Sequence, residues 1–214
     1  MKVRLVAAVF LVTAGLTAGQ VSAADSGGYF GVAAGQSMVD LDEGEINASL
    51  ASIGLGANTT VDDTDTGFKI FGGYQFNNNL AIEGAYSRFG KFASNSTITS
   101  GGSGTANGEW SGYSLDVAAL GMLPLGEKFT LFGRAGLSVW NLDFDFTASG
   151  PGGTATLSES ESGVSPLLGL GASFNFTPTI ALRAEYERHF AVGDEETTGD
   201  GDIDLISVGL VFKF

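Results

Sequence analysis

The stretch TGFKIFGGYQFNNNLAIEGAY, residues 66–86, decides the fold class of this chain. Large apolar side chains alternate with small or charged ones, and a period of two is the signature of a β-strand whose two faces differ. From Thr66 to Phe76 one face carries Phe68 and Ile70, whereas the other carries Lys69. Three asparagines then form a tight turn, and the alternation resumes from Leu80 to Tyr86. The stretch therefore predicts two antiparallel strands joined by a tight turn.

The same alternation recurs along the chain and predicts about eight strands. They are Gly28 to Val39, Thr66 to Phe76, Leu80 to Tyr86, Gly108 to Leu123, Phe129 to Phe146, Val164 to Phe176, Thr179 to Val192 and a terminal strand from Asp202. Most are near or above the roughly 9–11 residues that a tilted strand needs to cross a bilayer. An even number of strands brings both ends of the sheet to the same side.

The predicted connections alternate strictly between short and long. The tight turns are 77–79, 126–128 and 177–178, and the long loops are 40–65, 93–107, 147–162 and 193–201. Tight turns at one end and long loops at the other are typical of a bacterial outer-membrane barrel, in which the turns are periplasmic and the loops extracellular. Ile46, Leu50 and Ile53 predict one or two helical turns in the first loop, and the Ser/Gly-rich second loop is expected to be mobile.

The N-terminus has the pattern of a secretory signal peptide. Lys2 and Arg4 precede an apolar run from Leu5 to Leu16, and Val21-Ser22-Ala23 offers a cleavage site. The apolar run is shorter than the ~20 residues of a membrane-spanning helix. We therefore expect residues 1–23 to be a signal peptide and residues 24–214 to be one outer-membrane domain.

Composition excludes several classes of partner. The chain has no Cys and a formal net charge of −14, with no basic cluster. Disulfide bonds, nucleic-acid binding and attachment to anionic membranes through a polybasic patch are therefore not expected.

The charged residues within strands indicate which face of the sheet is inside. A water-soluble barrel would enclose its apolar face around a ligand, but large apolar side chains would overfill an eight-stranded interior. Small and ionisable side chains fit that interior and can pair there. The candidates for this interior charge network are Lys69, Glu83, Asp116, Arg134, Arg183, Glu185 and Glu187. The prediction is an all-β, eight-stranded antiparallel up-and-down transmembrane β-barrel, whose charges either fill the lumen as pairs or line a narrow ion pathway.

Aromatic residues mark the level of the tight turns, as an interfacial girdle does. The predicted members are Tyr29, Phe30, Tyr74, Phe76, Phe129, Phe174, Phe176, Phe212 and Phe214. Trp140, Leu142, Phe144 and Phe146 have the opposite parity from Leu131 and Leu137. Either a β-bulge lies near Val139 to Trp140, or this part of the strand rises above the membrane.

Four stretches carry a resemblance to a known family: residues 73–91, 131–140, 169–189 and 206–214. Over essentially the whole expected mature chain they resemble the transmembrane domain of the outer membrane protein A-like family. The resemblance implies that Phe212 and Phe214 form the C-terminal signal read by the barrel assembly machinery. Because the chain stops there, we expect the cell-wall-binding domain of longer family members to be absent. We expect a monomer in contact with membrane lipid and lipopolysaccharide, which serves envelope integrity and surface contact and reaches host or surface ligands through its loops. A narrow porin-like channel is the alternative, followed by an adhesin or a lipid-modifying enzyme.

No catalytic, cofactor or metal site is predicted. The single histidine, His189, is expected to be a rim residue, and no G-x-S-x-G motif occurs. The acidic stretch DGDIDL, from Asp200, has Leu205 where an EF-hand loop requires glycine. These carboxylates are therefore interpreted as solvated loop residues, with shared divalent ions from lipopolysaccharide as a hypothesis.

Overall fold

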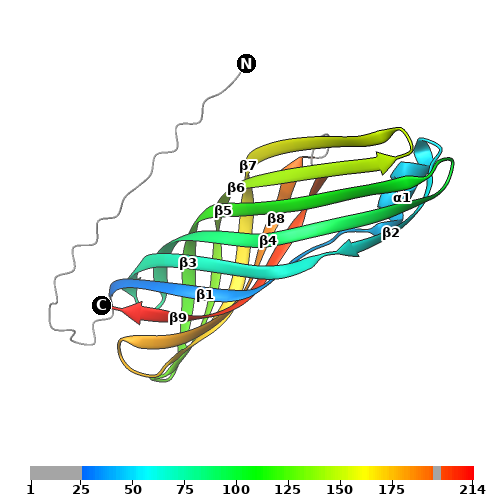
Figure 1. The fold of residues 1–214 in the computed structure, drawn as a ribbon. Coiled ribbons are helices and arrows are strands. Elements are labelled where there is room, and N and C mark those ends of the chain that lie inside the picture. Colours follow the sequence, from blue (N-terminus) through cyan, green and yellow to red (C-terminus); the bar gives the residue numbers. More distant parts are fainter. Residues whose placement is uncertain (1–25, 195–198) are drawn as a thin grey trace, which may run out of the picture.

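The computed structural model describes residues 26–194 and 199–214, which form an antiparallel sheet closed into a barrel (Figure 1). Its elements are β1 (Gly27–Val39), α1 (Glu43–Ser52), β2 (Gly56–Asp62), β3 (Thr64–Asn77), β4 (Leu80–Ser100), β5 (Gly104–Leu125), β6 (Phe129–Gly150), β7 (Gly153–Asn175), β8 (Ile180–Asp194) and β9 (Gly199–Lys213). Eight strands form the ring in the order β1-β3-β4-β5-β6-β7-β8-β9, and β9 pairs with β1. β2 is an additional strand that pairs with the far half of β4. The predicted fold class is confirmed, whereas the predicted signal peptide lies outside the described residues.

The outer face of the barrel carries exposed large apolar side chains, whereas the charged side chains of the membrane-spanning strands are buried on the inner face. Val117 and Leu170 are more than 60% exposed, although a soluble protein buries most residues of this kind. By contrast, the inward-facing Asp116 on β5 and Arg134 on β6 are buried. In a membrane this arrangement places hydrocarbon against apolar side chains and leaves the closed backbone ladder without unpaired groups in lipid.

The predicted bulge at Val139 to Trp140 is wrong. β6 pairs residue by residue with β5 from Thr105↔Ser149 to Leu125↔Phe129, so Trp140 keeps the inward direction of Arg134. Along β6 the outward side chains change from apolar to charged, since Val139 is followed on the same face by Asp143 and Asp145. Both carboxylates accept hydrogen bonds from serines of β7. This part of the strand therefore rises above the apolar band, as the other interpretation predicted.

Register shifts occur elsewhere in the described strands, and two of them lie just above the charged level of the barrel. The pairing of β4 with β5 shifts between Arg88 and Gly90, and Gly90 has a φ of 80°, which favours glycine. The β8 ladder shifts between His189 and Val192. Each bulge returns apolar side chains to the interior above the charged level of the barrel.

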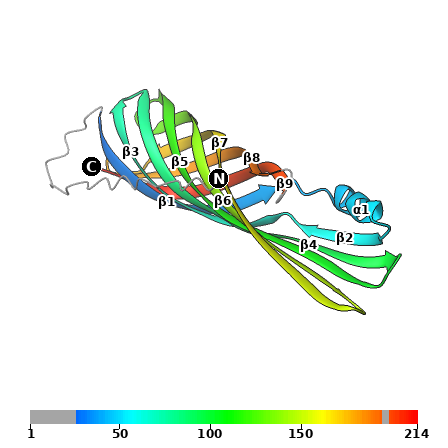
Figure 2. The same ribbon diagram turned by 90° about the horizontal axis from the view of Figure 1, so that it is seen from above.

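Most of the predicted long loops are strand. The predicted loop 93–107 extends β4 and β5 to a turn at 101–103, and the loop 147–162 extends β6 and β7 to a turn at 151–152. Figures 1 and 2 show both hairpins projecting beyond the barrel, with α1 beside β2. The predicted helical turns are confirmed as α1, which begins after Asp42, whose carboxylate accepts hydrogen bonds from the amides of Gly44 and Glu45. Within the described residues, no helix is long and apolar enough to cross a membrane.

The opposite end, which we call the periplasmic end, carries the three tight turns and an aromatic girdle. Phe30 stacks on Phe212 with ring centroids 5.1 Å apart, and further ring contacts join Tyr74 to Phe76 and Phe174 to Phe176, each at 5.4 Å. Tyr29 does not belong to this girdle, because its side chain points into the barrel. Tyr29 was therefore wrongly predicted as a girdle residue, because it lies in the barrel interior.

Candidate functional site

Six charged side chains meet in the middle of the barrel, and we call them the ionic network. They come from four strands: Lys69 on β3, Glu83 on β4, Arg134 on β6, and Arg183, Glu185 and Glu187 on β8. β8 contributes three because alternate residues of a strand share one face. All six are buried.

One half of the ionic network is centred on Glu187. The Lys69 Nζ atom lies 2.6 Å from a carboxylate oxygen of Glu187 and 2.9 Å from one of Glu185. The Arg134 Nη1 atom donates a hydrogen bond to the other oxygen of Glu187 and lies 3.3 Å from Glu185 and 3.4 Å from Glu83. Both oxygens of Glu187 are therefore held by cations.

The other half is centred on Arg183. Its Nη1 atom donates to Glu83 at 2.6 Å and its Nη2 atom to Glu185 at 2.9 Å. The guanidinium lies between two aromatic rings, 4.6 Å from the centroid of Phe71 and 4.3 Å from that of Phe132. With three cations and three carboxylates the network is neutral, which is the condition under which buried charges are tolerated.

Asp116, the seventh predicted residue, lies beside the network and forms no ion pair with its six members. One of its oxygens accepts a hydrogen bond from Ser87 at 3.2 Å, and the other lies 3.9 Å from the Nδ1 atom of His189. His189 is 0% exposed, so its prediction as a rim residue is wrong. Its ring packs on Phe89 and its Nδ1 atom lies 3.1 Å from Ser138 Oγ. The strand continues past this position, which the sequence alone placed near its end.

An apolar cluster of inward side chains occupies the barrel beyond this level, toward the external hairpins. It consists of Phe89, Phe92, Trp140, Leu142, Val192 and Ile203. All of these residues are buried, and the two on β6 lie where its outward face changes from Val139 to Asp143. The interior is therefore filled at two levels, first by ion pairs and then by apolar packing.

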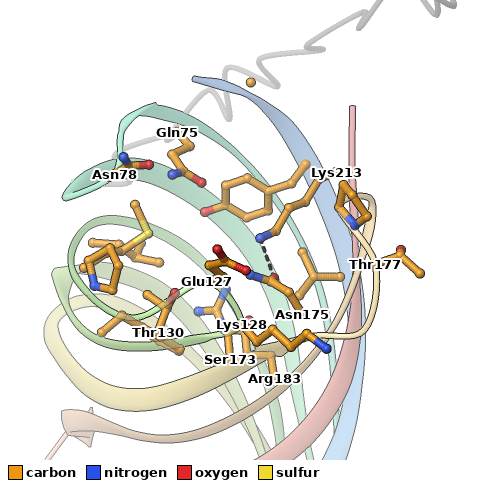
Figure 3. A pocket seen from close by; sticks show the side chains of 18 of the residues that line it. Gln75, Asn78, Glu127, Lys128, Thr130, Ser173, Asn175, Thr177, Arg183 and Lys213 are labelled. Atoms are coloured by element: carbon orange, nitrogen blue, oxygen red, sulfur yellow. Dashed lines mark hydrogen bonds between the residues drawn. The ribbon is translucent and has the colours of Figure 1, made fainter. Parts of the chain in front are cut away.

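A cavity of about 840 Å³ opens at the periplasmic end, and we call it the vestibule (Figure 3). The turn residues Asn78, Glu127 and Lys128 line its mouth. Tyr29, Phe132 and Arg183 line its inner part, where the Tyr29 hydroxyl donates to Glu83 at 2.9 Å. The vestibule thus reaches the ionic network.

Gly169 provides the space in which Arg134 crosses the barrel. A Cβ atom at this position would lie 2.8 Å from Arg134 Cγ and 3.0 Å from a backbone oxygen of β8. Gly169→Ala is therefore expected to lower the free energy of unfolding by about 1–3 kcal/mol, the usual cost of overpacking. Gly121→Ala is the matched control, because nothing lies within 4 Å of a Cβ atom there. Equal urea midpoints for the two variants would contradict the tight fit.

The geometry defines a class: an outer-membrane barrel of eight strands whose interior holds a buried salt-bridge network. The family model for the OmpA-like transmembrane domain matches residues 23–214, and the chain belongs to this family. It is an outer-membrane protein.

Individual relatives support this assignment. Outer membrane protein A of Yersinia pseudotuberculosis is 33% identical over 145 residues, which are 67% of this chain and 38% of that protein. The chain therefore aligns with less than half the length of this relative. Neisserial surface protein A is similar in structure, with a TM-score of 0.54 and 18% identity, covering 88% of this chain and 99% of that one. OprG of Pseudomonas aeruginosa has a TM-score of 0.51 and 14% identity, covering 90% and 98% of the two chains, and both likenesses concern the fold alone.

Proposed function

We propose that this barrel is a non-enzymatic structural component of the outer membrane, which supports envelope integrity and offers its external hairpins for surface contact. The observation that carries the proposal is the neutral ionic network, since six buried side chains with mutual contacts fill the place where a channel would need water. The apolar cluster adds a second filled level.

A deletion strain of the native Gram-negative host tests this role. Loss of the gene is expected to increase sensitivity to detergent and leakage of periplasmic enzymes, and the wild-type gene on a plasmid should restore both. A variant with the β6–β7 hairpin shortened above Asp143↔Ser160 should restore integrity but lose surface contacts. An unchanged envelope in the deletion strain would count against the proposal.

The alternative function is a narrow channel for small solutes, and the vestibule is the observation that favours it. Conduction would require both the ionic network and the apolar cluster to move aside. Swelling of liposomes in small sugars at the same rate as protein-free liposomes would argue against this alternative.

A lipid-modifying enzyme is a candidate function of another class, because Ser138 and His189 are in contact inside the barrel. The same Nδ1 atom of His189 faces both Ser138 and Asp116, so the ring does not relay a proton from one to the other. His189 is also buried between two filled levels. We propose no catalytic role, and equal lipid hydrolysis by the wild type and His189→Ala would support this.

The proposed partners are membrane lipid with lipopolysaccharide around a monomer, host or surface ligands at the hairpins, and the barrel assembly machinery during biogenesis. For assembly we infer that Phe212 and Phe214 form the recognised strand end, as the family resemblance implies. In the folded barrel, Phe214 also donates its amide to the Gly28 carbonyl across the β1–β9 seam.

Phe214→Ala is expected to reduce the amount of folded protein in cells several-fold, because it removes both the recognition residue and a ring beside Phe30. Phe176→Ala, an exposed girdle residue at a tight turn, is the control and should assemble normally. The measurement is the heat-modifiable fraction on gels of outer-membrane preparations. Equal folded fractions in both variants would refute the assembly role.

A further inference from the structure

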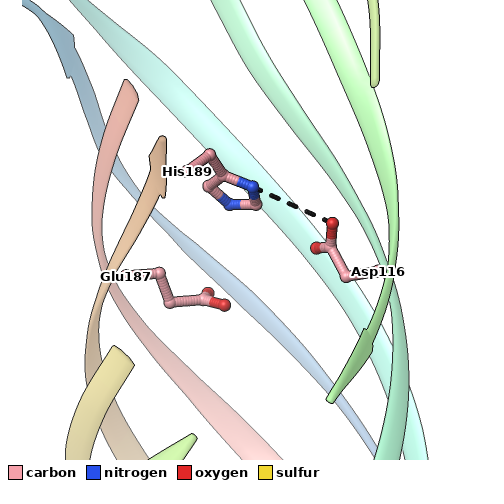
Figure 4. Close-up of side chains that lie close together, drawn as sticks. All are labelled: Asp116, Glu187 and His189. Carbon is pink, nitrogen blue, oxygen red and sulfur yellow. Dashed lines mark ion pairs between the residues drawn. The ribbon is translucent and has the colours of Figure 1, made fainter. Parts of the chain in front are cut away.

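A polar layer lies between the ionic network and the apolar cluster. Its members are buried and mostly small: Ser37, Ser87, Ser114, Ser138, Ser165, Ser207, Asp116 and His189. Asp116 on β5 and His189 on β8 point toward each other, and Glu187 lies beside them (Figure 4). One ligand atom from each of the three lies within 4.8 Å of the other two.

Several polar atoms of this layer have no hydrogen-bond partner within the part of the chain that the structure describes. They are Asp116 Oδ1, His189 Nε2, Ser114 Oγ and Ser165 Oγ. An unpartnered buried polar atom typically costs about 1–3 kcal/mol, and most such atoms in proteins are paired with water, protein or an ion. The unpaired oxygen of Asp116 is an electron-pair donor, and the Nε2 atom of His189 is one as well when the ring proton is on Nδ1.

Among the charged groups of the interior, the Asp116 carboxylate has no compensating cation of its own. The ionic network is neutral by itself, and Asp116 adds a fourth carboxylate. With His189 neutral, the interior carries one negative charge in excess. A lone buried charge is strongly unfavourable, and a divalent cation that carries one hydroxide as a further ligand would remove the excess.

We propose that Asp116, Glu187 and His189 bind one divalent transition-metal ion, with zinc as the best match. One imidazole nitrogen and two carboxylate oxygens form a three-ligand set that leaves a fourth position for water. Calcium and magnesium prefer six or more oxygen ligands, which three residues including a histidine do not provide. Lys69 and Arg134 hold the Glu187 carboxylate in place as outer partners, in the way that hydrogen-bonded groups orient metal ligands.

The site is closed on both sides, so the ion is expected to enter as the barrel forms. The test is therefore to refold the 24–214 chain into detergent with zinc, or with cobalt as a coloured probe, and to remove free metal by desalting. The expected result is about one ion per folded chain, with a visible cobalt absorption that zinc abolishes. Wild-type protein without stoichiometric metal would overturn the proposal.

Asp116→Asn and His189→Asn each change a direct ligand, so each is expected to lower metal affinity by more than the roughly 10–100-fold that loss of an outer partner costs. Asp204→Asn is the matched control, because Asp204 is a carboxylate outside the layer, bound to Arg188. Retention of metal by both site variants would also overturn the proposal. Should a site variant fail to fold, nitrogen NMR of His189 in the wild type decides the matter, since zinc must shift one ring nitrogen and an unchanged spectrum refutes coordination. None of these results depends on the role of the protein in the envelope.

Discussion

Glu187→Gln is expected to lower the free energy of unfolding by about 3–5 kcal/mol, the usual cost of removing one partner of a buried ion pair. The two oxygens of Glu187 neutralise Lys69 and Arg134, which lie 0% exposed at their side chains. The amide has almost the same shape but no charge, so the change isolates electrostatics from packing. The measurement is urea unfolding in lipid vesicles, followed by tryptophan fluorescence and gel mobility.

An exposed pair supplies the control for this variant. On the external hairpin, the hydrogen bond to Glu109 raises the pKa of the Lys91 ammonium, yet both side chains are largely exposed. Glu109→Gln should leave the urea midpoint nearly unchanged, because solvent screens such pairs. The double variant Glu187→Gln/Lys69→Met should recover part of the lost stability. A wild-type midpoint for Glu187→Gln would show that the network does not stabilise the barrel.

Trp140→Ala is expected to cost about 3–5 kcal/mol, the range for truncating a large buried aromatic residue. Trp140 packs with Phe92 and Leu142 in the apolar cluster, and its ring lies against the backbone at Gly163. The cavity left behind is enclosed by strands that a closed barrel holds in place. Relaxation around the missing ring is therefore limited.

Leu157→Ala is the matched control for this truncation. Leu157 lies on the neighbouring hairpin strand and is half-exposed, so its loss creates no cavity. Its urea midpoint should stay close to that of the wild type. Equal effects of the two variants would mean that the apolar cluster is not a packed core.

Much of this architecture follows from the period-two pattern. The ring of eight strands and the positions of the tight turns are predicted from alternation and turn residues, because one face meets lipid and the other a narrow interior. The inward direction of Lys69, Glu83, Asp116, Arg134 and the three β8 residues follows from parity as well. Successive residues of a strand point to opposite faces, so the sequence alone predicts which residues share a face.

The failures have two physical causes. Above the apolar band the outer face meets water, so polar side chains point outward and apolar ones inward, while the backbone alternation continues unchanged. In the sequence this exchange at Trp140 looks like a shift of parity, which a bulge would also produce. Residues 93–107 are mostly Ser, Thr, Gly and Asn on both faces, which made this stretch resemble a loop although its backbone is paired on β4 and β5.

The pairings inside the barrel depend on register between strands that are distant in sequence. Nothing local in the chain places Tyr29 against Glu83, or Arg183 between Phe71 and Phe132. The buried position of His189 was missed for a related reason, since the β8 bulge that keeps the strand going has no glycine to mark it. The ring of inward serines was a readable signal, because serines recur at the same level on six strands.

The central claim is that the interior is filled by paired charges and apolar side chains and does not conduct. Single-channel recording of the refolded protein in a planar bilayer tests it most directly. We predict a silent membrane for the wild type across physiological voltages. Stable, discrete openings that scale with the amount of protein would contradict the claim.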